Sequence, residues 1–289
     1  AYGMATGAFM SLAGVAGNFA SIKPHLDMAA PIMKSVPESA GGKQVLEHCS
    51  GRIEMDNVTF RYAEGAPAVL DDLSLKIRPG QSVGVVGKTG CGKSTLMRLL
   101  LGFEKPQKGA VLYDGRDIET LDVASLRRNI GTVLQDGKLF TGDIFSNIVV
   151  AAPWLTMEDA WEAAELAGIA DDIRAMPMGM NTMVSEGAGG ISGGQRQRIL
   201  IARAVAPKPK VLFFDEATSA LDNVTQRQVS EALDRMKCTR IIVAHRLSTI
   251  RACDRIIVLD GGRVVEDGTY EELCALGGVF AELVERQTM

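Results

Sequence analysis

SVGVVGKTGCGKS, residues 82–94, is the stretch that decides the fold. Residues 82–87 form a short apolar run, which is typical of a strand buried inside a parallel sheet. Residues 87–94, GKTGCGKS, fit the pattern G-x-x-x-x-G-K-[ST], whose glycines let the backbone wrap a triphosphate with its N–H groups inward. A helix is expected to begin near Lys93, where its N-terminal dipole favours an anion. The stretch therefore predicts a phosphate-binding loop in an α/β domain.

This phosphate-binding loop contains residue types with distinct chemical roles. Lys93 supplies a positive charge for the β- and γ-phosphates, and Ser94 supplies a hydroxyl ligand for Mg²⁺. The residues predicted to bind the nucleotide here are those of the loop and the residue after it: Gly87, Lys88, Thr89, Gly90, Cys91, Gly92, Lys93, Ser94 and Thr95.

Two carboxylates follow a second apolar run, VLFFDE at residues 211–216. A buried strand ending at the carboxyl edge of the sheet would hold both of them beside the phosphates. Asp215 suits the Mg²⁺ shell, and Glu216 suits polarising a water molecule for attack on the γ-phosphate.

The rest of the chain alternates apolar strands with helices, which indicates a largely parallel sheet. Further strands are expected at 52–62, 73–77, 111–115, 130–135 and 240–244, and a pair around the Gly-Gly turn in 255–268. Helices are expected at 156–176, capped by Thr156 with Asp159, and at 193–206 and 223–236.

ISGGQRQR, residues 191–198, allows two interpretations. Ser192 and Gln195 fit the S-x-x-Q capping box, so the segment can be a well-capped helix start. It can also be a second phosphate-binding helix N-terminus. The order of the three motifs resembles the ABC ATPase family, whose signature is L-S-G-G-Q. The resemblance covers roughly residues 51–272 and implies a P-loop NTPase (RecA-like) core with a mostly parallel sheet. It also implies an antiparallel β subdomain and an inserted α-helical subdomain at about 138–206 that carries the signature.

The resemblance also implies roles for single residues. Tyr62 would stack on adenine, the alternative being a strand aromatic packed in the core, and Glu186 would lie near the coupling helices. The implied catalytic residues are Glu216, His245, Gln135 and Lys93, and the implied metal ligands are Ser94, Gln135 and Asp215. The implied nucleotide contacts outside the loop are Tyr62, Ser192, Gly193, Gly194, Gln195 and Asp222.

The N-terminal segment differs in composition from the rest. Residues 1–22 carry no charge, and ESAGGKQ (38–44) has the composition of a linker, which predicts a boundary between 1–44 and 45–289. Residues 1–22 are either the tail of a last transmembrane helix or an amphipathic soluble helix. Pro24 and Pro31 are expected to divide the following residues into short helical pieces.

Composition excludes several classes of protein. The 289 residues are 46% hydrophobic with a net charge of −4, so neither disorder nor nucleic-acid binding is expected. The five cysteines form no C-x-x-C pair, which leaves a zinc site without support and indicates reduced thiols.

The resemblance implies an ATPase that uses ATP and Mg²⁺ to power export at the cytoplasmic face of the bacterial inner membrane. Its partners would be a second nucleotide-binding domain, in a head-to-tail ATP sandwich, and the coupling helices of a transmembrane domain. Phrases such as LLLGFEKPQKGAVLYDG (99–115) resemble bacteriocin exporters of the nitrile-hydratase-like leader peptide type, which implies a peptide substrate. The alternatives are export of a lipid or small molecule, a non-transport ABC ATPase, and ATP binding without turnover.

Overall fold

The computed structural model describes residues 2–35, 38, 42–134, 136–185, 190–215, 223–243 and 247–288. The chain divides into two compact units, Ala1–Gly42 and Lys43–Met289.

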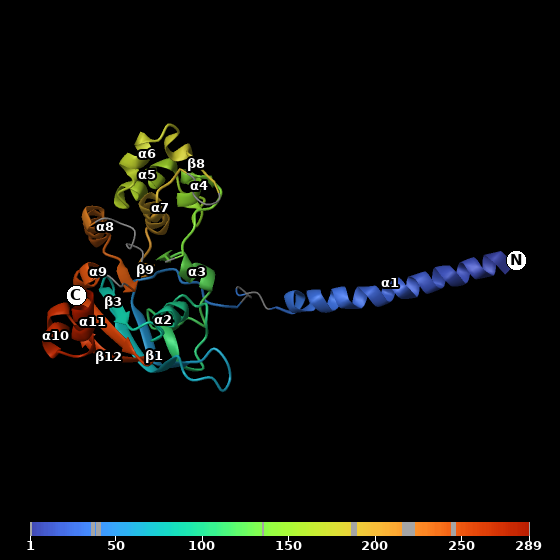
Figure 1. Ribbon diagram of the computed structural model, residues 1–289, viewed down its shortest axis with the longest axis horizontal. Coiled ribbons are helices and arrows are strands. Elements are labelled where there is room, and N and C mark those ends of the chain that lie inside the picture. The colour runs from blue at the N-terminus through green and yellow to red at the C-terminus, as the bar shows by residue number, and fades with distance from the viewer. Residues whose placement is uncertain are drawn as a thin grey trace. The chain divides into compact units, whose positions relative to one another are not determined.

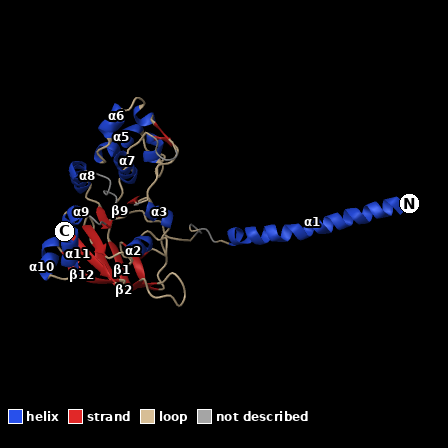
Figure 2. Cartoon of the chain, in the orientation of Figure 1, coloured by secondary structure: helices blue, strands red, loops and turns tan. Residues whose placement is uncertain are grey.

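A six-stranded sheet in the order β12-β11-β3-β10-β9-β6 forms the centre of the second unit (Figures 1 and 2). Neighbouring strands from β11 to β6 run parallel, and β12 pairs antiparallel with β11. The strands are β3 (Ser82–Gly87), β6 (Ile130–Val133), β9 (Val211–Asp215), β10 (Thr239–Val243), β11 (Arg255–Asp260) and β12 (Arg263–Gly268). Because β3 and β9 are apolar along nearly their whole length, they can be buried on both faces, as the sequence predicts.

A second, antiparallel sheet has the order β2-β1-β4-β5. Its strands are β1 (Ile53–Phe60), β2 (Leu70–Ile77), β4 (Lys108–Tyr113) and β5 (Arg116–Asp117). The two sheets meet at β2 and β12, where Asp71 N donates to Gly262 O at 3.0 Å and the Arg263 guanidinium pairs with the Asp71 carboxylate. Their apolar faces share one core cluster that also contains the buried face of α2 (Lys93–Leu100).

Short helices between residues 138 and 206 gather around a separate hydrophobic cluster. They are α4 (Ile144–Val149), α5 (Met157–Leu166), α6 (Ala170–Ala175), the 3₁₀ turn η1 (Gly179–Asn181) and α7 (Gly193–Val205), with the strand pair β7 (Gly142–Asp143) and β8 (Met183–Val184). Thr156 and Asp159 form the predicted capping box at the start of α5. The helical region predicted for 156–176 consists of two helices, because Gly168 takes a left-handed conformation (φ 66°) and separates α5 from α6.

The remaining helices are α3 (Val123–Arg127), α8 (Asn223–Arg235), α9 (Leu247–Arg251), α10 (Tyr270–Leu276) and α11 (Val279–Thr288). Three of them, α9 to α11, share a hydrophobic cluster with residues of β3 and β11, so they pack against a face of the parallel sheet. The Glu266 carboxylate on β12 accepts hydrogen bonds from Val279 N and Phe280 N, so a strand residue caps the start of α11.

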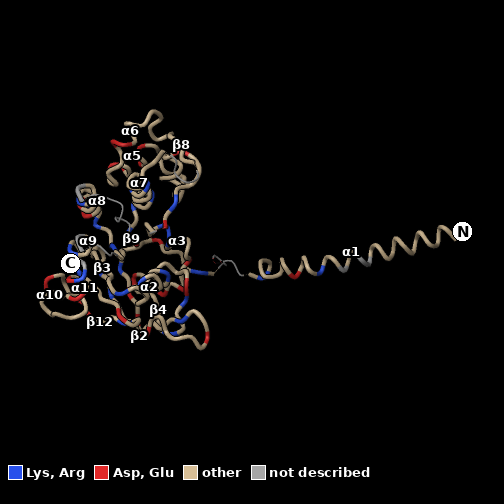
Figure 3. Tube along the Cα trace, viewed as in Figure 1, with Lys and Arg blue, Asp and Glu red and all other residues tan. Residues whose placement is uncertain are grey.

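The first unit is one helix, α1 (Tyr2–Lys34), of 33 residues. It continues through Pro24 and Pro31, so the prediction that these prolines divide it is wrong. Each proline removes one backbone donor, and the exposed surface of α1 leaves the freed carbonyls open to water. The charged residues of α1 lie only towards its C-terminal end (Figure 3). Among the described residues, no helix combines the length and apolarity needed to span a bilayer.

These elements confirm the predicted α/β class with a mostly parallel sheet, an antiparallel sheet and a helical region between β6 and β9.

Cys253 allows the packing beneath β3 to be tested. Its Sγ would lie 3.3 Å from a Cβ at Gly84, and burial raises the pKa of its thiol from 9.0 to about 11. Because the folded state holds this proton more tightly than the unfolded chain, the contribution to stability is complete below pH 9.0 and is lost as the pH rises towards about 11.

Between about pH 8 and about pH 10.5 the thiol makes the free energy of unfolding of the unchanged chain fall. We expect the fall over this range to be smaller in Cys253→Ala by about 2 kcal/mol. Denaturant unfolding at both pH values measures this difference, which is independent of the cost of the substitution itself. Equal losses in the two proteins would contradict the buried, protonated thiol.

Candidate functional site

Two of the predicted site segments leave the parallel sheet at the same edge. β3 ends at Gly87, where the phosphate-binding loop begins, and β9 ends at Asp215. In the register of the sheet, Val243 on β10 lies opposite both Val85 and Asp215. Asp215 is therefore level with the last residues of β3 and separated from them by one strand.

Glycines give the phosphate-binding loop (87–94) its shape. Gly87, Gly90 and Gly92 have φ values of 153°, 82° and 108°, which strain other residues. A Cβ at Gly87 would clash with Leu259 O on β11 and lie 2.6 Å from the Cys91 Sγ. A Cβ at Gly92 would lie 2.7 Å from Leu70 Cδ2. The loop is therefore pressed against both sheets at its two ends, while a Cβ at Gly90 would meet no atom within 4 Å.

Lys93 places its ammonium group inside this loop. Its Nζ donates to Gly87 O at 2.7 Å and to Lys88 O at 3.0 Å, and lies 3.9 Å from the Cys91 Sγ. The residue is 8% exposed. No described carboxylate pairs with it, so within the described part of the chain its buried positive charge faces the carbonyl dipoles of Gly87 and Lys88. An anionic group at the loop would supply the missing countercharge.

The start of α2 also favours an anion. Its N-cap is Gly92, and no side chain accepts a hydrogen bond from its first turn. Ser94 in that turn is exposed, whereas Thr95 is buried. The exposed hydroxyl and the uncapped N–H groups therefore fit phosphate oxygens and a Mg²⁺ ligand set.

Tyr62 reaches the loop from the end of β1. Its hydroxyl lies 3.0 Å from Thr95 Oγ1, and its ring packs edge-on against Phe60 at a centroid distance of 4.9 Å. Tyr62 is 54% exposed whereas Phe60 is buried, so Phe60 rather than Tyr62 is the core aromatic of this strand.

Ser192 begins α7 as the predicted N-cap. Its Oγ accepts a hydrogen bond from Gln195 N at 3.2 Å, and Gln195 Oε1 accepts one from Ser192 N at 3.0 Å. Sequence reasoning missed Asp172 on α6, whose carboxylate accepts hydrogen bonds from Gln195 Nε2 and Arg198 Nη1, both at 2.8 Å. No spacing pattern links Asp172 to α7, because the contact depends on how α6 packs. Gly193 is exposed and Gly194 half-buried, so the helix start is reachable from solvent.

Five residues singled out in the sequence lie outside the described part of the chain. They are Gln135, Glu186, Glu216, Asp222 and His245. Across the ranges that the structure describes, no group of three or more His, Cys, Asp or Glu could hold a metal ion.

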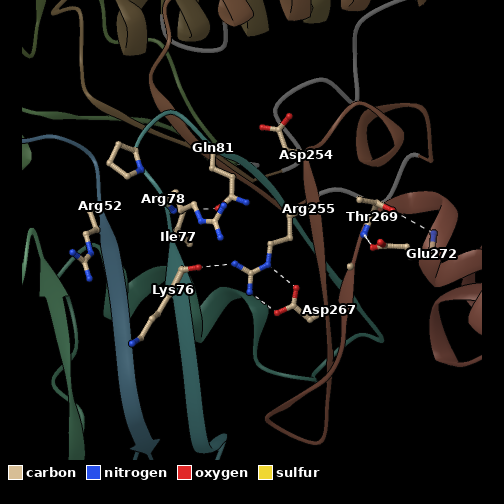
Figure 4. Close-up of a pocket in the computed structure, with 12 residues that line it drawn as sticks. Arg52, Lys76, Ile77, Arg78, Gln81, Asp254, Arg255, Asp267, Thr269 and Glu272 are labelled. Atoms are coloured by element: carbon tan, nitrogen blue, oxygen red, sulfur yellow. Dashed lines mark hydrogen bonds and ion pairs between the residues drawn. The ribbon is translucent and has the colours of Figure 1, made fainter.

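A groove of about 980 Å³ lies at the opposite end of the parallel sheet (Figure 4). Gln81, just before β3, and Arg255, the first residue of β11, line it. The Arg255 guanidinium donates to Asp267 and to Lys76 O, and the Glu272 carboxylate accepts from Thr269 N. None of the predicted site residues lines this groove, and many of its charges already satisfy one another. The candidate site is therefore the phosphate-binding loop and not this groove.

The comparisons with known proteins agree with the motifs. A family model described as ABC transporter matches residues 70–219. The cyclolysin secretion/processing ATP-binding protein CyaB of Bordetella pertussis is 44% identical over 285 residues, which are 97% of this chain and 40% of that protein. The alpha-hemolysin translocation ATP-binding protein HlyB of Escherichia coli O157:H7 is 43% identical over 258 residues, or 89% of this chain and 36% of that protein. The chain thus spans less than half the length of these relatives.

A solved structure is similar in fold. It is described as a bacterial Atm1-family ABC exporter with ATP bound, and it matches with a TM-score of 0.87 and 37% identity. The match covers 93% of this chain and 47% of that one.

The position of Tyr62 predicts that its ring contributes to ATP affinity and that its hydroxyl contributes little. Tyr62→Ala should weaken ATP binding by about 1–3 kcal/mol, because a stacking surface for adenine is lost. Tyr62→Phe keeps the ring and loses only the contact with Thr95, so its ATP affinity should stay within about threefold of the unchanged chain. Equilibrium titration with Mg-ATP measures both variants. Unchanged ATP affinity in Tyr62→Ala, together with lower stability, would mean that the ring serves only packing.

Proposed function

The chain belongs to the ABC transporter family, and we propose that it binds Mg-ATP and hydrolyses it to power export. The observation that carries the proposal is the buried Lys93 ammonium, which contacts loop carbonyls and no described carboxylate. A triphosphate in the loop would neutralise that charge, and the N–H groups at the start of α2 would bind its oxygens.

The role that we propose for each residue follows from the chemistry of its side chain. Lys93 and the loop amides hold the phosphates, and Tyr62 offers its exposed ring to adenine. Ser94, Asp215 and Gln135 would hold Mg²⁺, which would supply positive charge to offset the charge that develops on the phosphates. Glu216 would orient and deprotonate the attacking water, and His245 would contact the γ-phosphate.

We further propose that two copies of this domain act together. The chain offers two helix starts for phosphate, at Lys93 and at Ser192, and they differ in structure. The first has no side-chain cap, whereas the second is capped by the Ser192 hydroxyl. One triphosphate occupies one phosphate-binding loop, so we assign the Ser192 end, with Gly193, Gly194, Gln195 and Asp222, to the nucleotide of the opposing subunit.

The proposed cargo is a peptide or protein. Support comes from the relatives, whose names describe secretion or translocation of cyclolysin and alpha-hemolysin. The bacteriocin type of cargo stays a prediction. The proposed location is the cytoplasmic face of the bacterial inner membrane. The proposed partners there are the coupling helices of a transmembrane domain, which would lie near Glu186.

Lys93→Ala tests the nucleotide site. Removing the ammonium should weaken Mg-ATP binding by about 1.5–3 kcal/mol or more, because a charge-assisted contact with the phosphates is lost. Lys76→Ala is the matched control, since Lys76 is an exposed lysine at the opposite end of the sheet. Calorimetric titration with Mg-ATP compares the two variants. Near-normal affinity in Lys93→Ala would refute the placement of the nucleotide.

The proposed dimer is tested with Glu216→Gln, which keeps the shape of the side chain and loses its basicity. We expect turnover to fall steeply while ATP stays bound, so that the dimer becomes more stable with rising ATP by mass action. Adding Ser192→Arg should crowd the shared phosphate site and return the chain to monomers without changing its own loop affinity.

Light scattering with and without Mg-ATP reads the mass of both variants. A Glu216→Gln chain that stays monomeric at saturating ATP would contradict the ATP-sandwich proposal. A double variant that dimerises as well as Glu216→Gln would leave Ser192 with its capping role alone.

A further inference from the structure

Arg203, on the last turns of α7, is a half-buried arginine that contacts only neutral groups among the described residues. Its Nε donates to Asn147 O at 2.7 Å, its Nη2 to Asn147 Oδ1 at 2.7 Å, and its Nη1 to Lys138 O at 3.1 Å. The guanidinium carbon lies 5.0 Å from the centre of the Phe140 ring. Burial lowers the pKa of Arg203. The three nitrogens of its planar guanidinium group form a fork of hydrogen-bond donors, the Arg203 fork. This fork joins α7 to Lys138 and to Asn147.

Asn147, the main acceptor, is itself 1% exposed and fully engaged. Its Oδ1 also accepts a hydrogen bond from Phe140 N at 2.8 Å. Its Nδ2 donates to Phe140 O and to Asp143 O, both at 2.9 Å. Asn147 therefore closes residues 140–147 into one hydrogen-bonded loop, and Arg203 fastens that loop to α7.

The chain leading into this loop also lies directly on α7. A Cβ at Gly137 would lie 2.9 Å from Leu200 Cδ1, and a Cβ at Gly131 on β6 would clash with Ala204 O. α4 and α7 pack side by side in the helical region (Figure 1). The C-terminal half of α7 thus contacts β6, the loop and α4 with little room for independent movement.

We propose that Arg203 is a positioning residue that makes α7 and residues 138–147 move as one body. α7 carries Ser192 at its other end, so a shift of that end on phosphate binding would reach the loop beside β6 through the Arg203 fork. This inference rests on the proposed function, because it assigns the Ser192 end of α7 to the opposing nucleotide.

The chemistry of Arg203 is better suited to joining α7 to residues 138–147 than to stabilising the fold. A half-buried cation with no anionic partner among the described residues gains little stability, and an apolar side chain of similar volume is often equally stable in such a place. An apolar side chain would fill the space but could not bond to Lys138 and Asn147 together. The donors of the fork are therefore what a substitution has to remove.

The test compares Arg203→Met and Arg203→Lys with the unchanged chain. Methionine removes charge and donors, whereas lysine keeps the charge but cannot reach all three acceptors at once. In Arg203→Met we expect kcat for ATP to fall about tenfold or more, with KM and the Kd for Mg-ATP within about twofold. Hydrogen exchange of the amides of 138–147 should accelerate, while exchange in 93–101 should not. Arg203→Lys should show a smaller kcat loss.

Arg174→Met is the matched control. Arg174 lies in the same helical region and its guanidinium carbon is 5.1 Å from the centre of the Trp161 ring, but it pairs with Glu165 and Asp171 and does not touch 138–147. Its kcat and the exchange of 138–147 should match those of the unchanged chain.

The proposal is overturned if kcat and exchange are unchanged in Arg203→Met, or if kcat falls only in proportion to the folded fraction measured by denaturant unfolding. Full kcat in Arg203→Lys would also overturn it, since charge alone would then suffice. Where Arg203→Met fails to fold, Arg203→Lys decides the question by the same readouts. An unchanged chain that does not hydrolyse ATP would refute the proposed function instead, and the exchange comparison would still decide whether Arg203 holds 138–147.

Discussion

The contact between Gly87 and the Leu259 carbonyl leaves no space for a side chain, and the phosphate-binding loop depends on it. Gly87 lies opposite Leu259 in the parallel register of β3 and β11, and a Cβ there would clash with the carbonyl oxygen. At the other end of the loop, Gly92 is pressed against Leu70 on β2. The loop is therefore clamped between the parallel and the antiparallel sheet, and its curvature follows from how the two sheets join.

That clamped backbone determines where the charge of Lys93 can lie. Because α2 starts immediately after Gly92, the Lys93 side chain folds back over the loop and donates to Gly87 O and Lys88 O. α7 starts differently, since Ser192 and Gln195 satisfy one another. The start of α2 thus has uncapped N–H donors beside the buried Lys93 ammonium. The start of α7 is already capped by its own side chains and keeps the exposed residue Ser192. This asymmetry supports different roles for the two helix starts.

Sequence reasoning succeeded where local patterns control structure. The apolar run of β3, the glycine loop, the Thr156 cap and the Ser192 cap each depend on residues within a few positions of one another, and each is observed. It failed at Pro24 and Pro31, which α1 accommodates without a break. It could not find the Arg203 fork, because Arg203 and Asn147 are 56 positions apart and two of the three acceptors are backbone carbonyls, which every residue has. The predicted roles of Gln135, Glu216 and His245 remain predictions from the motifs.

The two ends of the parallel strands differ in how strongly their cations would attract a bound anion. At the groove end, Arg255 is held by Asp267, and Arg52 and Lys76 share Glu54. An anion binding there would have to displace carboxylates that already neutralise these cations, at little net gain. At the loop end, the described contacts of Lys93 are carbonyl oxygens and a thiol, and its burial limits screening by water. The same Coulomb attraction is stronger in that less polar setting. Anion affinity is therefore expected at the loop and not at the groove.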